Sequence, residues 1–273
     1  MHLYILKTNT MKIDDIVEYL DARFHPEYQE DYDNAGFLVG NGMADYTGAL
    51  VALDLTPAVV AEAKRLGLNL IVTHHPFIFS GLKRVTDRTE AGRMLMELVR
   101  SGIAVYAAHT NLDNLPDGVN GILARKLGLT GCRILRVAEF GTLNSEQIGA
   151  GMVGELPVAE DAEAFLLRVK ERLGLPVVRH CSGPALVRRV AICGGSGSFL
   201  IGDAMRAGAD AYLTADLKYH DFQRPEGSML LADIGHYESE QFAKEIIYGA
   251  ISEKFCNFAC RISECQQGLV QYI

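Results

Sequence analysis

The feature that most constrains the fold of this chain is a regular alternation of short apolar runs with longer segments of helical period. Three runs, residues 49–55, 68–74 and 103–109, are largely apolar and show no regular alternation of apolar with polar residues. Two segments of helical period, 56–67 and 88–102, lie between them, and each ends at a glycine. Continuous apolar strands joined by helices are typical of a parallel sheet that is covered on both faces. The first half therefore predicts a βαβαβ arrangement.

From about Cys132 the pattern loosens, and residues 187–216 then repeat the strand–helix–strand order. The expected strands are residues 148–156, 177–181, 187–193, 209–216 and 228–235, and the expected helices are residues 160–174, 198–208 and 236–255. The C-terminal segment 262–273 is a candidate for a last strand. Strands that alternate with helices again favour an α/β architecture.

An internal similarity relates the two halves. Residues 65–75 align with residues 206–216 at an offset of 141, whereas the preceding strands align Val51 with Val190 at an offset of 139. This difference predicts two residues inserted in the turn of the second copy. We interpret the similarity as two related α/β halves, with a chance likeness of two βαβ units as the alternative. The first copy ends in two histidines where the second has Ala-Asp.

These patterns predict two related, interlinked α/β domains with largely parallel sheets flanked by helices. We expect the first domain to comprise residues 1–130 and 236–273, and the second to comprise residues 131–235. A chain of 273 residues is long enough to bury the cores that such domains need. Ligands of open parallel sheets bind beyond the carboxyl ends of the strands, so we expect a site in the cleft between the domains.

Composition narrows the classes of function. The net charge of −8 disfavours general binding to nucleic acid, because an acidic surface repels phosphate groups. We find no signal peptide and no apolar run long enough to span a membrane, so we expect a cytoplasmic protein. Cys256, Cys260 and Cys265 form a C-x3-C-x4-C cluster without a matching second half. We interpret them as reduced thiols, with a metal site as the lesser alternative.

Paired histidines follow the second predicted strand. His74 and His75 come directly after an apolar run, at the strand end where ligands of α/β sheets bind, and the rigid Pro76 follows them. Imidazole is a ligand for zinc, iron, nickel and copper. The alternative is that both histidines are polar loop residues, and this pair alone does not decide between the two.

Two further strand ends carry histidine together with a carboxylate. His109 and Asp113 follow the strand that ends near residue 107, and His236 and Glu240 follow the strand near residue 232. The i, i+4 spacing of His236 and Glu240 puts both side chains on one face of a helix, although a solvated helix face is the alternative. Three strand ends that share these residue types favour metal binding. Such a set of imidazoles and carboxylates is suited to a two-metal centre.

Four further residues are candidates for lining the same cleft. Asp33 and Asn34 are candidates for hydrogen bonds into it, or for a simple turn. Asp216 and His220 follow the strand of the second copy, and an exposed loop is the alternative for His220. The glycine-rich segment 194–198 is a candidate phosphate loop, but it lacks the lysine of a P-loop and a tight turn is favoured.

Several motifs occur together in one order. They include "DNAGFLVGN" (33–41), "ALDLT" (52–56), "LIVTHHPFIF" (70–79), "VYAAHTNLD" (105–113), "GADAYLTADLKYHD" (208–221) and "DIGHYESE" (233–240). With them the chain resembles the dinuclear-metal-centre proteins known as GTP cyclohydrolase type I, type 2 homologues, in their short form without a central insert. This group is also described as transcriptional-coactivator-interacting-factor-like. One departure is Ala215, where the family motif commonly has glycine.

The resemblance implies the ligand set of a dinuclear centre. The five matching positions are His74, His75, Asp113, His236 and Glu240. It implies one imidazole of the paired histidines for each ion, Glu240 as the bridge, and His109 as a catalytic proton relay beside the ions. It further implies two divalent ions per chain (zinc, iron or manganese), opening of the guanine ring of GTP, and a homo-oligomer that forms a hexameric ring.

The expected function is therefore that of a metal-dependent hydrolase acting on a small molecule of unknown identity. Five ligands shared by two ions leave coordination positions open, which is typical of catalytic and not of closed structural sites. The alternative is a metal-binding oligomeric scaffold or a regulatory partner protein that turns over no substrate.

Overall fold

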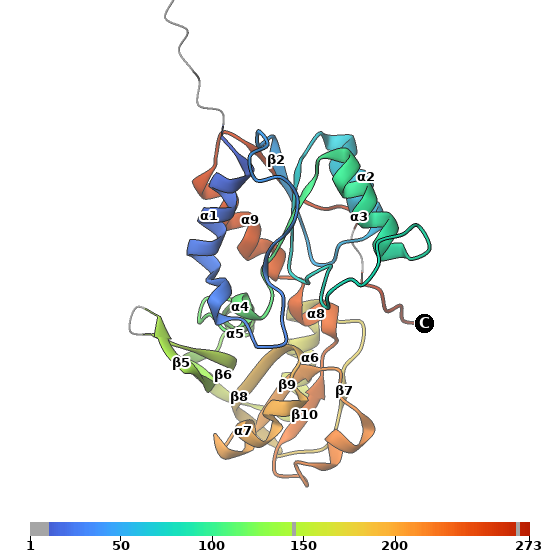
Figure 1. Cartoon of the computed structure of the whole chain (residues 1–273). Helices are drawn as coiled ribbons and strands as arrows, with labels where there is room; N and C mark the ends of the chain where they lie inside the picture. Colours follow the sequence, from blue (N-terminus) through green and yellow to red (C-terminus); the bar gives the residue numbers. More distant parts are fainter. Residues whose placement is uncertain (1–10, 144–145, 266–267) are drawn as a thin grey trace, which may run out of the picture. The chain divides into compact units, whose positions relative to one another are not determined.

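The structure is a computed structural model that describes residues 11–143, 146–265 and 268–273 (Figure 1). The chain forms two compact units, each assembled from separate segments. Unit 1 contains the described residues of Met1–Pro26, Tyr32–His109 and Ile247–Gln266, and unit 2 contains those of Glu27–Asp31, Thr110–Ile246 and Gln267–Ile273. Each unit has one sheet flanked by helices, which confirms the predicted class of interlinked α/β domains.

Among its described residues, unit 1 has a five-stranded sheet in the order β1–β4–β3–β2–β11. The strands are β1 (Gly36–Val39), β2 (Gly48–Ala52), β3 (Leu70–Thr73), β4 (Ala104–Ala107) and β11 (Ala259–Ile262). β11, β2, β3 and β4 run parallel, and β1 is antiparallel to β4. The carboxyl ends of β2, β3 and β4 therefore meet at one edge of the sheet.

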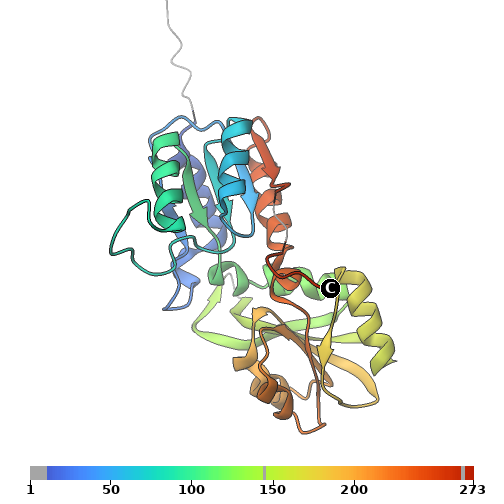
Figure 2. The ribbon, with the colours of Figure 1, turned by 90° about the vertical axis from the view of Figure 1, so that its right-hand side faces the viewer.

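Helices cover both faces of this sheet. They are α1 (Ile13–Phe24), α2 (Pro57–Leu66), α3 (Glu90–Ser101) and the C-terminal part of α9 (Ala243–Lys254). α2 and α3 lie on one face, and α1 and α9 lie on the other (Figure 1), and Figure 2 shows α2 and α3 in front of the strands. The hydroxyl of Tyr19 donates to the carbonyl of Ala250 over 3.0 Å and so ties α1 to α9. The N-cap of α2 is Thr56, whose side chain accepts from the backbone N–H of Val59.

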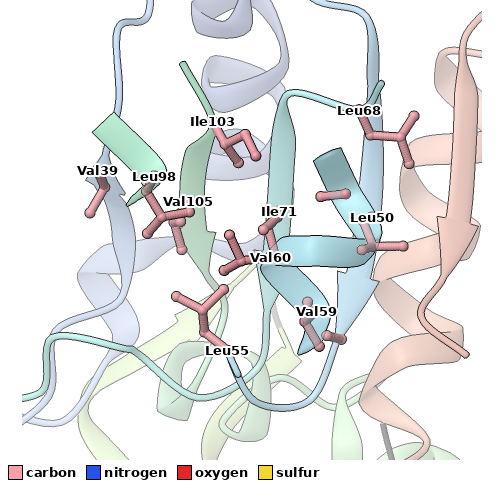
Figure 3. Close-up of a cluster of buried hydrophobic side chains, with 12 residues drawn as sticks. Val39, Leu50, Leu55, Val59, Val60, Leu68, Ile71, Leu98, Ile103 and Val105 are labelled. Carbon is pink, nitrogen blue, oxygen red and sulfur yellow. The ribbon is translucent and has the colours of Figure 1, made fainter. Parts of the chain in front are cut away.

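The core of unit 1 lies between α2, α3 and the sheet (Figure 3). Alternate strand residues point to the same face, so Leu50, Ile71 and Val105 from three neighbouring strands meet Val60 and Leu98 from the two helices. All five are at most 3% exposed. Burial of this apolar surface, at about 25 cal/mol per Å², is the main stabilisation of the arrangement.

The described residues of unit 2 form a six-stranded sheet in the order β5–β6–β8–β9–β10–β7. The strands are β5 (Thr130–Leu143), β6 (Glu146–Asp161), β7 (Arg179–His180), β8 (Leu186–Ser196), β9 (Ala211–Ala215) and β10 (Leu230–Asp233). β8, β9 and β10 are parallel, whereas β5, β6 and β7 join the sheet in antiparallel pairs. This sheet is therefore mixed. The link between β5 and β6 is too short for a parallel crossover, so these strands form a hairpin.

Short helices surround the sheet of unit 2. They are α4 (Thr110–Asp113), α5 (Val119–Leu127), α6 (Ala162–Leu173), α7 (Ile201–Arg206) and α8 (His236–Glu240), with the 3-10 turns η1 (Pro26–Tyr28), η2 (Ser198–Leu200) and η3 (Tyr219–Gln223). The single helix expected over residues 236–255 is divided into α8 and α9. The division arises because a new hydrogen-bond ladder starts at Phe242, whose carbonyl accepts from Glu245 N.

Strand pairing corrects the alignment of the two halves. Ala49 pairs with Leu70 in unit 1, and Val190 pairs with Ala211 in unit 2, so both pairs are 21 residues apart. The register equates Val190 with Ala49 and not with Val51. An offset of 141 therefore relates these paired residues of the two copies, and the two extra residues of the second copy lie at a register shift in β8 between Ile192 and Ser196.

The end of the chain also differs from expectation. The last strand, β11, ends at Ile262, and the described residues of the segment 263–273 form no further strand. Among the described residues, the helices are all too short or too polar to cross a lipid bilayer.

Candidate metal centre

Three histidines of unit 1 form a compact group at the carboxyl edge of its sheet, called the imidazole cluster here: His74, His75 and His109. His74 and His75 follow β3, and His109 follows β4, the neighbouring parallel strand. The ring centroids are 5.0 Å apart for His74 and His75, 5.3 Å for His74 and His109, and 5.4 Å for His75 and His109. The parallel register of β3 and β4 brings the two strand ends together and so assembles the cluster.

Each of the paired histidines is oriented by an acceptor that follows the end of a neighbouring strand. Nδ1 of the fully buried His74 donates to the carbonyl of Ala108 over 2.7 Å, just beyond β4. Nδ1 of His75 donates to Oδ1 of Asp54 over 2.6 Å, just beyond β2. A proton on Nδ1 leaves the lone pair on Nε2, which is the tautomer that binds a metal ion through Nε2.

His109 is held in the same way by Asp33. Nδ1 of His109 donates to Oδ1 of Asp33 over 2.8 Å, and the side chain of Asp33 is 0% exposed. The backbone N–H of Asn34 donates to the same oxygen over 2.7 Å, so the carboxylate is fixed from two sides. The side chain of Asn34 donates to the carbonyl of Ile78, in the loop after the paired histidines. Asp33 therefore orients an imidazole, and Asn34 anchors the loop beside it.

The imidazole cluster has the geometry of a metal-binding group. One ring nitrogen from each of the three histidines lies within 4.8 Å of the others. Imidazole nitrogens whose second N–H is held by a carboxylate or carbonyl are common ligands of zinc and iron. The donor set of unit 1 thus fits a divalent transition metal.

Unit 2 contains a second group, formed by Asp216, His236 and Glu240. Nδ1 of His236 lies 2.7 Å from Oδ2 of Asp216, and Nε2 lies 2.9 Å from Oε2 of Glu240. Partial burial acts to lower the pKa of His236, but the hydrogen bonds and charges of Glu240 and Asp216 outweigh it and raise the pKa to about 9. A positive charge is therefore stabilised between these two carboxylates.

Asp113 is a further carboxylate of unit 2 and lies near Glu240. It ends α4, and its backbone carbonyl accepts from Nδ2 of Asn120 over 3.1 Å. A carboxylate oxygen of Asp113 lies within 4.8 Å of one of Glu240. Burial, and then the charges of Asp113 and Glu240, raise the pKa of the Cys193 thiol. Two carboxylates at this distance repel each other unless a cation or a proton neutralises them, which is the electrostatic signature of a cation site.

The glycine-rich segment 194–198 makes room for Glu240. A Cβ atom on Gly195 would lie 2.0 Å from Oε1 of Glu240, and one on Gly197 would lie 2.5 Å from the hydroxyl of Tyr212. The backbone N–H of Gly195 also donates to Oγ of Ser239 over 3.0 Å, which links β8 to α8. Gly195 therefore lets the carboxylate-bearing helix α8 pack directly on the end of β8.

The remaining candidates lie elsewhere. His220 is exposed on η3, where Nδ1 is 3.3 Å from Oε1 of Gln223. All six cysteines of the chain are free thiols. Cys260 lies on β11, and burial raises its pKa to about 12, which makes it an inert thiol.

Asp54 is the functional candidate that the sequence interpretation missed. It lies within the motif "ALDLT", two residues beyond the end of β2, as His75 lies two residues beyond the end of β3. Ala52 pairs with Thr73, so the register places Asp54 beside His75. A comparison of the two predicted strand ends, position by position, would have indicated this pair.

Comparisons with known proteins agree with the fold and the motifs. The model of the family described as Duf34/NIF3 (NGG1p interacting factor 3) matches residues 11–267. A protein from Clostridium perfringens named "GTP cyclohydrolase 1 type 2 homolog" is 34% identical over 84% of this chain and 87% of its own length. A protein of the same name from Lactococcus lactis is 35% identical over 86% of this chain and 89% of its own length.

Solved structures show the same architecture. The crystal structure of a Staphylococcus aureus hypothetical protein superimposes with a TM-score of 0.86 at 29% identity and covers 97% of this chain and 100% of that one. A Bacillus cereus protein related to NIF3 superimposes with a TM-score of 0.87 at 22% identity, with the same coverage, and supports the fold. The chain belongs to the Duf34/NIF3 family.

Proposed function

We propose that the protein binds two divalent metal ions and uses them to hydrolyse a small-molecule substrate. The proposed ligands are His74, His75, Asp113, His236 and Glu240. The observation that carries the proposal is the Nδ1 hydrogen bond of His74 and of His75, because it selects the tautomer that binds metal through Nε2. Proximity of Asp113 and Glu240 supports it from unit 2.

In this proposal each unit supplies part of the ligand set. Continuity of the chain supports a shared ligand set. His109 is the last residue of its segment in unit 1, and Asp113 ends the four-residue helix that follows directly. One turn of helix rises only about 5.4 Å, so residues four apart stay close.

In this proposal divalent ions would supply Lewis acidity and would lower the pKa of a water molecule toward neutrality. Side chains of the protein supply the charge and the proton transfer that the reaction needs. Asp113 and Glu240 provide negative charge. His109, fixed by the buried carboxylate of Asp33, is oriented to accept a proton at Nε2 and to deliver it to a leaving group. Imidazole and carboxylate ligands suit zinc, iron and manganese.

The substrate is proposed from the relatives. The name "GTP cyclohydrolase 1 type 2 homolog" of the similar proteins makes the guanine ring of GTP a candidate substrate. We also propose that the chain acts in the cytoplasm as a homo-oligomer, with a hexameric ring as the expected form; light scattering of the purified protein would measure its mass.

The experiment that tests the proposal compares the purified protein with Glu240→Ala and with Glu238→Ala, a control on the same helix. Metal content by mass spectrometry is expected to be two ions per chain in the wild type and the control, and reduced in Glu240→Ala. Phosphoesters, cyclic amides and nucleotides including GTP are then screened, with formate release as the measure of ring opening. Metal content that Glu240→Ala leaves unchanged would contradict the site. Equal turnover in Glu240→Ala would contradict metal-dependent catalysis, and metal without any turnover would favour a scaffold.

A further inference from the structure

Two imidazoles of the proposed centre, one in each unit, are held at Nδ1 by a carboxylate that is not itself a proposed ligand. Oδ1 of Asp54 accepts from Nδ1 of His75 over 2.6 Å in unit 1. Oδ2 of Asp216 accepts from Nδ1 of His236 over 2.7 Å in unit 2. Each carboxylate belongs to the segment that follows the end of a parallel strand, β2 for Asp54 and β9 for Asp216.

Strand register produces the contact in unit 1. Ala52 and Thr73 are the last residues of β2 and β3 and pair with each other. The backbone N–H of His75 donates to the carbonyl of Leu53 over 2.9 Å, so the parallel alignment continues beyond the strands. Asp54 is thereby placed opposite His75. Both side chains are only about a quarter exposed, 27% and 23%, so this pair is better shielded than an ordinary surface ion pair.

The contact in unit 2 has an independent origin. Asp216 stands at the position that the offset of 141 equates with His75, and its backbone adopts a φ of +57°, which is rare for a residue with a side chain. The hydroxyl of Ser196 donates to the same Oδ2 that contacts His236. The carboxylate is therefore held in place from β8 while it contacts the imidazole. His75 in the first half and Asp216 in the second half thus stand at equivalent positions. Asp54 contacts His75, and His236 contacts Asp216.

We propose that Asp54 and Asp216 are positioning residues that fix the ring orientation of His75 and His236 for metal binding. This inference rests on the proposed function. Carboxylates that contact the distal nitrogen of a ligating histidine lock its orientation and raise its basicity, and their loss typically weakens metal affinity by about 10–100-fold.

Replacement of Asp54 or Asp216 by asparagine tests whether the carboxylate group itself positions the imidazole. An asparagine has nearly the same shape as an aspartate, so packing is retained while the negative charge is lost. Its side chain can also rotate and donate its NH₂ group to Nδ1, which would stabilise the tautomer with a proton on Nε2. That tautomer presents an N–H where the ion needs a lone pair.

The experiment measures zinc affinity by competition with a chromophoric chelator for the wild type, Asp54→Asn and Asp216→Asn. Asp87→Asn, on the exposed loop before α3, is the matched control. Each of the two variants is expected to bind zinc about 10–100-fold more weakly, while the control is unchanged. Melting temperatures of the zinc-free proteins separate an effect on the site from an effect on folding, and Asp54→Glu should restore part of the affinity by returning the charge.

A second measurement does not depend on the variants. ¹⁵N NMR of the histidine rings in the wild-type, zinc-free protein at pH 8 is expected to show His75 with its proton on Nδ1. A proton on Nε2 of His75 would overturn the inference, as would wild-type zinc affinity in both asparagine variants. If the wild type binds zinc, iron and manganese no better than Glu240→Ala does, the proposed function fails and the inference with it. Wild-type binding that is equally strong in both asparagine variants rejects the positioning role alone.

Discussion

A Cβ atom on Gly195 would lie 2.0 Å from Oε1 of Glu240, closer than any side chain can approach a carboxylate without displacing it. The φ of Gly195 is +62°, a conformation that glycine adopts without strain. Glu240 is 3% exposed and is one of the proposed ligands. The bare backbone at position 195 therefore allows a carboxylate to sit against the end of β8.

Gly195→Ala is expected to displace Glu240 and to weaken metal binding by at least about tenfold, because the added methyl group and the ligand cannot occupy the same space. Left-handed backbone strain alone costs about 1–2 kcal/mol. Gly67→Ala is the control, because Gly67 has a φ of +68° and a Cβ atom there would meet no described atom within 4 Å beyond its chain neighbours. Gly67→Ala should lose only the stability that the left-handed backbone costs, Gly195→Ala should lose more because of the clash with Glu240, and only Gly195→Ala should lose metal. Equal metal affinity in the two variants would contradict the assignment of Glu240.

Stability of the metal-free protein is expected to fall as the pH rises from about 6.5 to about 9. The pKa of His236 is raised to about 9 in the folded protein, because Glu240 and Asp216 outweigh the effect of burial. A group whose pKa is higher in the folded than in the unfolded protein stabilises the fold fully at pH values below its unfolded pKa, here about 6.5. This stabilisation is lost as the pH rises through the pKa of the folded state. The measurement is the melting temperature between pH 6 and pH 10 in the presence of a chelator. His236→Gln should remove this component, and an identical pH profile in that variant would contradict the assignment.

Metal affinity should change with pH in the opposite direction. A metal ion needs the neutral imidazole, so binding below about pH 9 must release the proton of His236. Zinc affinity is therefore expected to rise by up to about tenfold per pH unit from this group between pH 6.5 and pH 9. Calorimetry in buffers of different ionisation enthalpy measures the released proton. Zinc binding at pH 7 without proton release would be inconsistent with the geometry at His236.

Ser263→Ala is expected to destabilise unit 1 by about 1–3 kcal/mol, because it removes a donor from a buried carboxylate. Oγ of Ser263 donates to Oε2 of Glu62 over 2.5 Å, and Glu62 is 3% exposed. Burial acts to raise the pKa of Glu62, but hydrogen bonds led by that of Ser263 outweigh it and lower the pKa. The lowered pKa contributes stability above the unfolded pKa of about 4.5 that is lost in acid.

Urea unfolding at pH 7 and pH 4 measures this effect, and the difference between Ser263→Ala and the wild type should shrink at the lower pH. Ser252→Ala is the control, because that hydroxyl bonds only within helix α9 in the contacts described, to the carbonyls of Tyr248 and Gly249. A larger loss in Ser252→Ala than in Ser263→Ala would contradict the role of Glu62.

Ile71→Ala is expected to lower the free energy of unfolding by about 2–5 kcal/mol, because it opens a cavity in the core of unit 1. Ile71 is 0% exposed between α2, α3 and the sheet. The matched control is Val99→Ala on α3, a residue that is 66% exposed. Chemical denaturation measures both variants, and a loss below about 1 kcal/mol in Ile71→Ala would show that the core tolerates the gap.

Local signals in the sequence predicted much of the fold. Thr56 and Gly67 delimit α2 because their cap chemistry acts within a few residues of the chain. The alignment of Val51 with Val190 failed because strand pairing, a non-local property, decides which residues are equivalent. The break between α8 and α9 was missed for a related reason: the periodic pattern continues across Phe242, where the backbone ladder restarts.

The candidate site was predictable where residue type alone identifies the chemistry. His74, His75 and His109 were found because imidazoles at strand ends are uncommon and point to metal binding. Asp54 was not found, because aspartate is frequent in loops and its meaning comes from the residue beside it on the next strand. The role of Gly195 was missed for the same reason, because it depends on how closely Glu240, which is distant in the sequence, approaches it.

Strand β11 has a consequence for how the protein is made. It lies beside β2 in the sheet of unit 1, yet about 200 residues separate the two strands, Gly48–Ala52 and Ala259–Ile262, along the chain. During translation the apolar edge of β2 emerges from the ribosome long before its neighbour is synthesised. Exposed strand edges of this kind invite pairing with other nascent chains. Premature termination before β11 would leave that edge permanently uncovered, so truncated products should aggregate and depend on chaperones.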